Sequence, residues 1–528
     1  METSKVLRSA AVVGSLTLLS RFLGMIRDLL TAGLFGTSLP MSAFVVAFRI
    51  PNLFRRLFGE GALSSAFVPV FMEVRTREGA EAGWHLASKV ISLAAVVLVG
   101  FTLTGIGLTY LLQTGADSLN QRDLILSLTR IMLPYMILIC LVALCMGILN
   151  SLHHFAIPAF TPSLLNVVWI ITLLAVCPWL GDSLEEKIYG LAWGILVAGG
   201  LQLGLQIPIL RRHGFRFRPS LNLRDPKVWR VLLLMGPASI GLAVTQINVM
   251  VNSLLAAWIG PWAPAALFYS ERLLYFPQGI LATAMSTVLL PVFSGQMARA
   301  QDQAMRHTMN HSLRVLWFVM TPAAIGLLVL ARPIVQMLFE WGRFDRASTD
   351  LTTLALQCYA PGLIVFSLAK IFVPAFYARQ DPRTPVKIGL LSVGINLILN
   401  LIFLFTLPLY WKHAGLAFST VIAEGVNGVL LGRQVHRRIG SPGWKEIFSS
   451  GLRTLFASGV MALALVLSFS PLQKTLAAMV RPEKIAQIVL VGLLVLIGIL
   501  TYVAAAALLR SSELNELVTT VKKKLRRT

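Results

Sequence analysis

Charged side chains occur inside stretches of this sequence that are otherwise apolar enough to lie in a membrane. The first such stretch carries Arg21, Arg27 and Asp28, and a later one carries Glu271 and Arg272. A guanidinium group donates two parallel hydrogen bonds to phosphate or carboxylate oxygens, which a lysine ammonium cannot do. Several guanidinium groups in one low-dielectric cleft repel each other when the cleft is empty. These residue types therefore indicate a site for a multiply anionic ligand such as a diphosphate.

The second apolar stretch adds Arg49, Arg55, Arg56 and Glu60. Arg56 and Glu60 are four residues apart, a spacing that allows a salt bridge on one helix face. A charge at mid-membrane costs at least about 2.5–3.5 kcal/mol on insertion scales, so it is expected to have a compensating role. We predict that the arginines line a cleft and that three acids temper their charge. The predicted cleft residues are Arg21, Arg27, Arg49, Arg55 and Arg272, with Asp28, Glu60 and Glu271 as partial counter-charges.

Helix geometry limits how these groups can be arranged. Arg21 and Arg27 are six residues apart, or about 240° around a helix, so one can line the cleft while the other pairs or snorkels. Neighbouring positions diverge on a helix, so Arg27 and Asp28 are expected to point apart and Asp28 to pair with another helix. Arg314 lies near the end of its apolar stretch, where long basic side chains commonly snorkel. Structural pairing of several of these groups is the alternative to a binding role.

A second set of polar residues lies late in the chain. Asn396 and Asn400 are four residues apart, and Thr420 and Glu424 occur on the next apolar stretch. These side chains are weak candidates for a small-cation site, and hydrogen bonding between helices is the favoured interpretation. The four cysteines have no zinc-type spacing, so neither a metal site nor a bound cofactor is predicted.

The elements that must position these residues are membrane-spanning helices. The chain has 528 residues, of which 56% are hydrophobic and 13% charged, whereas a soluble domain carries roughly 25% charged residues. About 14 stretches are long enough to span a bilayer, which takes about 20 apolar residues. The fold class predicted is an all-α membrane protein. The stretches lie near 7–35, 41–74, 84–112, 123–150, 158–178, 187–211, 227–260, 263–298, 307–330, 348–378, 385–407, 413–436, 447–470 and 484–509.

The net charge of +23 has a topological explanation. If the N-terminus is cytoplasmic, alternate loops collect most of the Lys and Arg, which is the positive-inside pattern. Both termini are then predicted to be cytoplasmic. The basic clusters are expected to face lipid headgroups rather than nucleic acid, and residues 511–525 are expected to form a short interfacial helix.

Short motifs recur at a nearly constant offset. Residues 5–8 (KVLR) are echoed by residues 227–230 (KVWR), and the PVF of residues 69–71 recurs at 291–293. Three further matches follow in the same order, about 222–226 residues on. The shift corresponds to six spans, so the two halves point the same way across the membrane, as in parallel-repeat transporters. Only the first half carries the arginines of the first span, which favours a functional role for them.

The repeat predicts a domain organisation. Residues 1–222 form an N-lobe of six spans and residues 223–440 a C-lobe of six more. Residues 441–510 hold two additional spans, and residues 511–528 form the basic tail. No P-loop, GxSxG or HExxH motif occurs, and every hydrophilic loop is short, so the chain is predicted not to be an enzyme.

Several runs resemble one known family. They are SRFLGMIRD at residues 20–28, AFVVAFRIPNLFRRLFGEGA at 43–62, FPQG at 276–279 and FYARQDPRTPVK at 376–387. Together they resemble the MurJ (MviN) lipid II flippases of the multidrug/oligosaccharidyl-lipid/polysaccharide exporter superfamily, and the resemblance covers essentially the whole chain.

The resemblance implies two six-helix lobes and two extra helices, the latter forming a groove for a long lipid tail. The family's essential arginines match Arg21, Arg27, Arg55 and Arg272, and its first-span acid matches Asp28. Two departures occur, because Ser42 and Tyr275 stand where some relatives carry acids.

The resemblance also implies a ligand and a location. The ligand is lipid II, an undecaprenyl-diphosphate-linked peptidoglycan precursor. The chain is expected in the bacterial inner membrane, functioning as a monomer among membrane lipids. The energy source is expected to be the membrane potential or a monovalent cation.

The alternatives to a lipid II flippase are a flippase for another polyprenyl-diphosphate glycan and a cation-coupled drug exporter. A membrane enzyme acting on polyprenyl phosphates and a scaffold without transport are less favoured. A drug exporter should show carboxylates where this chain has arginines.

Overall fold

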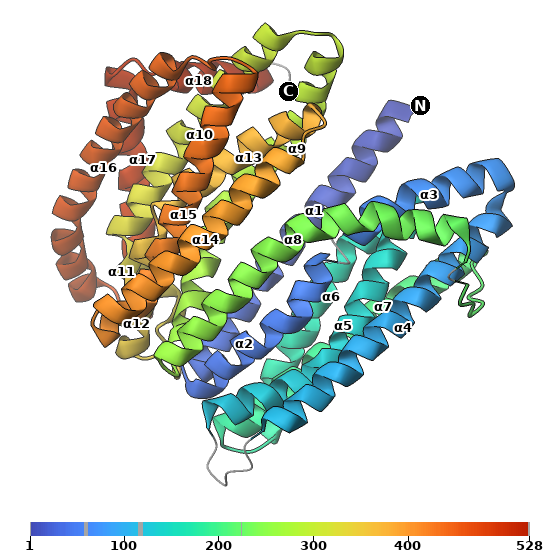
Figure 1. Cartoon of the computed structure of the whole chain (residues 1–528). Coiled ribbons are helices and arrows are strands. Elements are labelled where there is room, and N and C mark those ends of the chain that lie inside the picture. The colour runs from blue at the N-terminus through green and yellow to red at the C-terminus, as the bar shows by residue number, and fades with distance from the viewer. Residues whose placement is uncertain (1, 58–61, 114–119, 223, 526–528) are drawn as a thin grey trace. The chain divides into compact units, whose positions relative to one another are not determined.

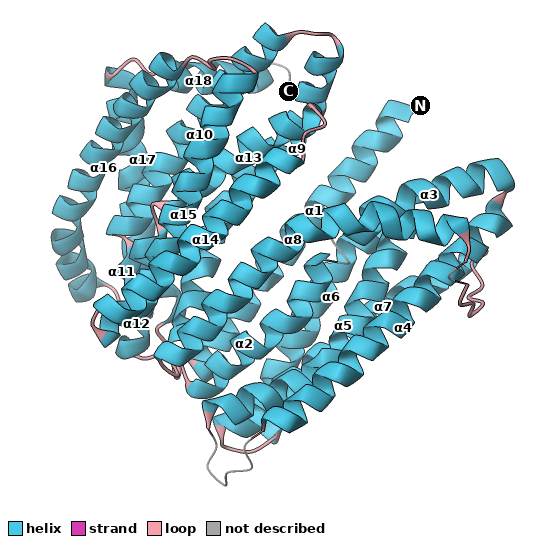
Figure 2. Cartoon of the chain, in the orientation of Figure 1, coloured by secondary structure: helices cyan, strands magenta, loops and turns pink. Residues whose placement is uncertain are grey.

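The computed structural model describes residues 2–57, 62–113, 120–222 and 224–525. Within these ranges the chain is helical, with short connections and no strand (Figure 2). It divides into two compact units, residues 1–265 and 266–528. The predicted all-α membrane fold is confirmed. Glu60 lies outside the described residues, so its predicted pairing with Arg56 does too.

Among its described residues, the first unit holds eight α-helices, α1 to α8, and two short turns that extend α6 (Figure 1). Its elements are α1 (Glu2–Phe35), α2 (Leu39–Phe54), α3 (Ala62–Glu78), α4 (Ala80–Leu112), α5 (Gln121–Ser151), α6 (Ala156–Ile171), η2 (Thr172–Val176), η3 (Cys177–Trp179), α7 (Leu184–Arg212) and α8 (Pro226–Ile259).

The second unit holds the remaining helices, apart from the first three residues of α9. They are α9 (Ala263–Ala298), α10 (Asp302–Val329), α11 (Ala331–Phe339), α12 (Arg346–Tyr359), α13 (Gly362–Ala378), α14 (Arg383–Thr406), α15 (Leu409–Arg438), α16 (Trp444–Met479), α17 (Glu483–Leu508) and α18 (Ser512–Leu525).

Each of the fourteen predicted apolar stretches lies on one helix or on a consecutive set of helices. The stretch 41–74 is divided between α2 and α3, and 348–378 between α12 and α13, which are bent by 44°. Among the described residues, nine helices are long and apolar enough to cross a membrane, or ten if the bent pair is one span. The helices outside these nine include α1, which carries charged residues, and α2 and α9, which contain internal prolines. The chain is a multi-pass membrane protein.

Helix bounds recur at the offset predicted from the motifs. α8 begins about 224 residues after α1, and α15 begins about 225 residues after α7. Contacts place α8 with α2, α3 and α4 in the first unit. The division by contacts therefore lies after α8, whereas the predicted lobe boundary at 222/223 describes the internal repeat and stays a prediction.

Short polar side chains begin several of these helices. The Ser38 hydroxyl accepts a hydrogen bond from the Met41 amide at the start of α2, and Asp225 accepts one from the Lys227 amide at the start of α8. Ser183 accepts from the Glu186 amide at the start of α7. Such caps satisfy backbone N–H groups that have no partner within the helix.

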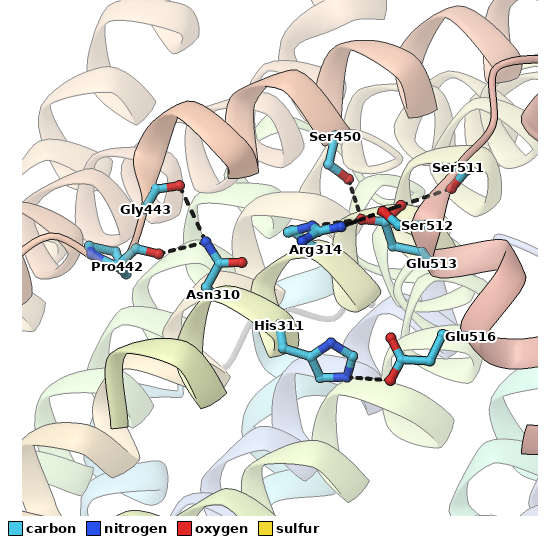
Figure 3. A network of polar contacts seen from close by, with 10 residues as sticks. All are labelled: Asn310, His311, Arg314, Pro442, Gly443, Ser450, Ser511, Ser512, Glu513 and Glu516. Carbon is cyan, nitrogen blue, oxygen red and sulfur yellow. Dashed lines mark hydrogen bonds and ion pairs between the residues drawn. The ribbon is translucent and has the colours of Figure 1, made fainter. Parts of the chain in front are cut away.

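The C-terminal helix α18 is tied to α10 and α16 by a buried carboxylate (Figure 3). Glu513 is only 4% exposed. Its Oε1 accepts hydrogen bonds from Arg314 Nε at 2.7 Å and Ser450 Oγ at 2.8 Å, and its Oε2 accepts one from Ser511 Oγ at 2.8 Å. Arg314 thus forms an ion pair within the protein, where snorkelling was expected. The helix predicted for 511–525 is present, and its interfacial position stays a prediction.

The same network sets the acidity of Glu513. Burial alone raises the pKa of this carboxyl, but hydrogen bonds from its own backbone amide, Ser511, Ser450 and Arg314 lower the pKa to about 2. The ionised form is therefore the one that the fold stabilises. Because the native pKa is depressed, this stabilisation is complete above the ordinary value of 4.5 and is lost as the pH falls toward 2.

We predict that Glu513→Gln lowers the stability of the purified protein at pH 7 by about 1–3 kcal/mol, because Arg314 loses its charged partner. The difference from wild type should shrink as the pH falls below the ordinary carboxyl pKa. Thermal unfolding in detergent as a function of pH measures both effects. Glu516→Gln, one turn along at an exposed pair with His311, is the matched control and should change little. Equal stability of Glu513→Gln and wild type at pH 7 would contradict this account.

Candidate functional site

Arg27 and Asp28 form a buried ion pair on α1. The Nε and Nη2 of Arg27 donate to Asp28 Oδ1 at 2.9 and 2.6 Å. Arg27 is 8% exposed and Asp28 is 6% exposed. The expectation that these neighbours point apart is wrong, because a flexible arginine side chain is long enough to reach around the helix to the next residue. Pairing offsets part of the cost of burying both charges.

A second helix completes the surroundings of Arg27. The Oδ1 of Asn166 on α6 accepts a hydrogen bond from Arg27 Nη1 at 2.9 Å, and its Nδ2 donates to the Ser20 carbonyl at 2.9 Å. The Arg27 guanidinium lies 4.6 Å from the centre of the Trp169 ring. Three of the five N–H donors of Arg27 are thus engaged, and one face of its charge is covered by an aromatic ring.

Trp169 belongs to an aromatic cluster that joins α2 to α6. Its ring packs edge-on against Phe44 at 5.4 Å and Phe48 at 5.7 Å, and its Nε1 donates to Thr31 Oγ1 at 3.2 Å. Phe48 also contacts Tyr135 of α5. This packing fixes the position of the Arg27 pair relative to α2, the helix that carries the next arginines.

The other arginines of the first unit are more accessible. Arg21 is exposed on α1, and Arg49 is half-buried on α2. Arg55, at the C-terminal end of α2, is half-buried and donates from Nε to Asn52 Oδ1 at 3.1 Å. The structure thus gives these side chains different surroundings, with Arg27 the most enclosed.

In the second unit, Glu271 and Arg272 occupy adjacent positions on α9. Tyr359, the last residue of α12, donates from its hydroxyl to Glu271 Oε1 at 3.4 Å. Arg272 is exposed, and its guanidinium lies 4.5 Å from the centre of the Phe268 ring one turn earlier. Glu271 is therefore linked to the bend between α12 and α13, while the charge of Arg272 remains accessible.

The two departures from the family pattern differ in their surroundings. Ser42 is fully buried in α2, and its hydroxyl accepts a hydrogen bond from the Ala265 amide at 3.3 Å. Tyr275 is exposed on α9. A serine at position 42 supplies a neutral bond to the beginning of α9, at a position where a buried acid would need a positive partner.

The polar residues of α14 and α15 bond to one another. Asn396 Nδ2 donates to Ser419 Oγ at 3.2 Å and to Thr420 Oγ1 at 3.4 Å, and Asn400 Nδ2 donates to Asn396 Oδ1 at 3.2 Å. These bonds fit the favoured interpretation of helix-to-helix hydrogen bonding. Glu424, one turn beyond Thr420, instead accepts from Asn427 at 2.9 Å. Among the described residues, no group of three or more His, Cys, Asp or Glu side chains could hold a metal ion.

Sequence reasoning missed Asn166 and Trp169 as partners of Arg27. An asparagine inside the apolar stretch 158–178 is the signal that could have revealed the first, since an amide in a membrane span needs a bonding partner. Trp169 gave no such signal, because an aromatic residue in an apolar stretch is most often part of the core. The pairing of Arg27 with Asp28 depends on a side-chain conformation that spacing does not specify.

The profile of the family described as lipid II flippase MurJ matches residues 31–508. The chain belongs to the MurJ family. A MurJ relative from Vibrio cholerae, named probable lipid II flippase MurJ, is 35% identical over 82% of this chain and 83% of its own length. One from Burkholderia cenocepacia, named lipid II flippase MurJ, is 36% identical over 84% of this chain and 86% of its own length.

Solved structures agree with membership of the MurJ family. A lipid II flippase MurJ in an inward closed conformation matches with a TM-score of 0.77 and 25% identity, covering 94% of this chain and 98% of that one. An inward-facing MATE-family multidrug resistance transporter of the MOP superfamily matches with a TM-score of 0.66 and 15% identity, covering 81% of this chain and 98% of that one. The second likeness shows the shared fold.

We predict that Asn166→Leu destabilises this MurJ family member by about 1.5–3 kcal/mol, because it removes the hydrogen bond from a buried, charged Arg27 donor. The measurement is thermal unfolding in detergent. Asn150→Leu is the control, since Asn150 is exposed at the end of α5. If the two variants unfolded at the same temperature, the amide would have no special role at Arg27.

Proposed function

We propose that this protein moves lipid II from the inner to the outer leaflet of the bacterial cytoplasmic membrane. Membership of the MurJ family across residues 31–508 is the observation that carries the proposal. The arginines of the membrane helices support it chemically, since lipid II carries a diphosphate between its polyprenyl chain and its sugars. Guanidinium groups in surroundings of low dielectric suit that group far better than a cation or a neutral drug.

In the mechanism we propose, the headgroup enters an inward-open cleft and the arginines hold the diphosphate. The proposed set is Arg21, Arg27, Arg49, Arg55 and Arg272. Asp28 pairs with Arg27 in this structure. A diphosphate that binds Arg27 therefore replaces some of the hydrogen bonds that Asp28 and Asn166 accept from its guanidinium. The guanidinium of Arg272 is exposed and lies over the Phe268 ring, so a diphosphate can reach it.

Ligand binding is proposed to change the balance between two states of the transporter. An empty, positively charged cleft favours separation of its walls, and a bound diphosphate reduces that repulsion and favours closure. The membrane potential supplies about 2.3 kcal/mol per charge per 100 mV, which can return the empty, positive cleft toward the cytoplasm. A monovalent cation at the α14–α15 amides is the other candidate for coupling.

The remaining features of the proposal rest on the charge pattern of the loops and on the exposed surface of two helices. Both termini are assigned to the cytoplasm, because this places most basic loops on that side. The α16–α17 pair is assigned to the polyprenyl tail, since exposed Leu467 and Leu508 leave apolar surface on these helices. The protein is proposed to act as a monomeric transporter without a cofactor, and not as an enzyme.

Depletion of the protein distinguishes the proposed substrate from that of a related glycolipid flippase. We expect lysis of growing cells, with lipid II accumulating in the inner leaflet. Leaflet distribution is measured by the accessibility of lipid II to a membrane-impermeant reagent in spheroplasts. Loss of a surface polysaccharide without lysis would favour a flippase for another polyprenyl-linked glycan. Drug sensitivity alone would favour an exporter.

Arginine substitutions test the mechanism in proteoliposomes. We expect Arg27→Ala and Arg272→Ala to reduce lipid II flipping at least tenfold, because loss of one charge-assisted hydrogen bond costs about 1.5–3 kcal/mol. The corresponding lysine variants should recover only part of the rate, since lysine cannot bond bidentately.

An inside-negative potential should speed wild-type flipping in the same vesicles. The effect should be the same with and without sodium if the potential is the driving force.

Arg212→Ala is the matched control for these variants. Arg212 is exposed at the end of α7, outside the proposed set. Its variant should flip lipid II at the wild-type rate. Unchanged flipping by Arg27→Ala and Arg272→Ala would remove the arginines from the mechanism, while leaving the substrate assignment to the depletion experiment.

A further inference from the structure

An open cavity of about 390 Å³ lies at the junction of α4 and the segment that follows α7, within the first unit. This volume is in the lower range of small-molecule sites. The first turns of α4 contribute Trp84 and His85, and the segment after α7 contributes His213, Arg216 and Arg218. None of these residues belongs to the arginine set proposed for flipping.

The walls of the cavity are held by bonds that do not involve its charges. The Arg218 amide donates to Ser88 Oγ at 3.3 Å, and the Ser220 amide donates to Ser92 Oγ at 3.2 Å. Gly214 has a φ of +87°, which lets the chain turn back at the end of α7. The Trp84 ring packs at 5.3 Å against Phe215 behind this turn. The segment is therefore positioned along α4 before any ligand binds.

Acidic side chains next to the cavity are paired with other bases. Asp225 accepts a hydrogen bond from Lys89 Nζ at 2.6 Å, and Glu78 pairs with Lys227. A third acid, Glu73, lies 3.0 Å from Arg230. Most of the negative charge at this end of the unit is thus committed to ion pairs outside the cavity.

Glu81 is the one acid among the residues that line the cavity. It lies 3.8 Å from both Arg218 and His85, and its side chain is 80% exposed, so both contacts are weak. The Arg216 side chain makes no hydrogen bond, ion pair or ring contact within the ranges that the structure describes. Beneath the cavity, Arg75 stacks 5.0 Å from the Trp84 ring centre, and its buried Nη1 has no hydrogen-bond partner there.

We propose that this cavity binds a phosphate group. Two guanidinium groups and two imidazoles surround a concave space with a single exposed acid, which concentrates positive potential inside it. Arginine matches the paired oxygens of a phosphate, and the N-terminal end of α4, where Ala80 and Glu81 line the cavity, adds partial positive charge. The phosphate can belong to an anionic lipid headgroup or to a soluble phosphorylated compound.

This site lies beyond the proposed flipping function and does not depend on it. The assigned topology places the cavity at the cytoplasmic end of the first unit, where an inner-leaflet lipid or a cytoplasmic solute can reach it. A bound phosphate would bridge α4 and the segment after α7, and so would stabilise the basic end of the N-lobe.

The test is chemical protection of arginines in the full-length protein. Phenylglyoxal modifies accessible guanidinium groups, and mass spectrometry locates the products. We expect inorganic pyrophosphate to slow the modification of Arg216 and Arg218 several-fold in detergent, and to leave Arg211 and Arg212 unaffected. Those two arginines are exposed at the end of α7 and do not line the cavity, so they provide an internal control.

A second arm compares nanodiscs of phosphatidylglycerol with nanodiscs of phosphatidylcholine. Protection by pyrophosphate in both identifies a site for soluble phosphates, whereas protection by phosphatidylglycerol alone identifies a lipid headgroup site. Repeating the assay in an Arg27→Ala, Arg272→Ala background keeps the result independent of the flipping site. Equal modification of all four arginines under every condition would overturn the proposal.

Discussion

A guanidinium group inside a membrane protein must have its charge and its N–H donors compensated. The partners that do this help to fix how the helices pack against one another. At Arg27 the compensation is local and nearly complete, since a carboxylate, an amide oxygen and an indole ring surround one side chain. Leaving such a charge unpaired in apolar surroundings costs several kcal/mol. The position of α1 relative to α6 is therefore fixed by the hydrogen bond and the ring contact of Arg27 as well as by apolar packing.

The same requirement is met differently elsewhere in the chain. Arg272 lies over a phenylalanine ring and remains exposed, and Arg314 pairs with the buried carboxylate of Glu513. The first arrangement leaves a charge accessible to a ligand, whereas the second uses the charge to attach a helix. Burial and partners thus separate arginines with a proposed binding role from an arginine with a structural one, although all three occur in apolar helices.

A transporter that binds a diphosphate gains from arginines that already have a partner. Asp28 and Asn166 compensate the charge and the N–H donors of Arg27 when no ligand is bound. A diphosphate can offer the same guanidinium more negative charge in the same geometry. In the mechanism we propose, this pairing lowers the cost of the empty site, and a conformational equilibrium shifts by the difference in diphosphate affinity between its two states. Asp225, Glu78 and Glu73 are committed to ion pairs with other bases, which leaves the basic segment after α7 with surplus charge.

The sequence by itself determined where the apolar helices lie, because a bilayer demands about 20 apolar residues per span and this signal is local. That 41–74 is divided between α2 and α3, and 348–378 between α12 and α13, appeared only in the structure. It also predicted the internal repeat and the chemical class of the site, since Arg21, Arg27 and Arg272 stand out in apolar surroundings. Only the tertiary structure decided which residues surround each charge. Asn166 and Trp169 are more than 130 residues from Arg27 in the chain, and no local pattern encodes their meeting. The ion pair of Arg314 with Glu513 likewise joins residues almost 200 positions apart, because side-chain partners across helices are set by packing rather than by periodicity.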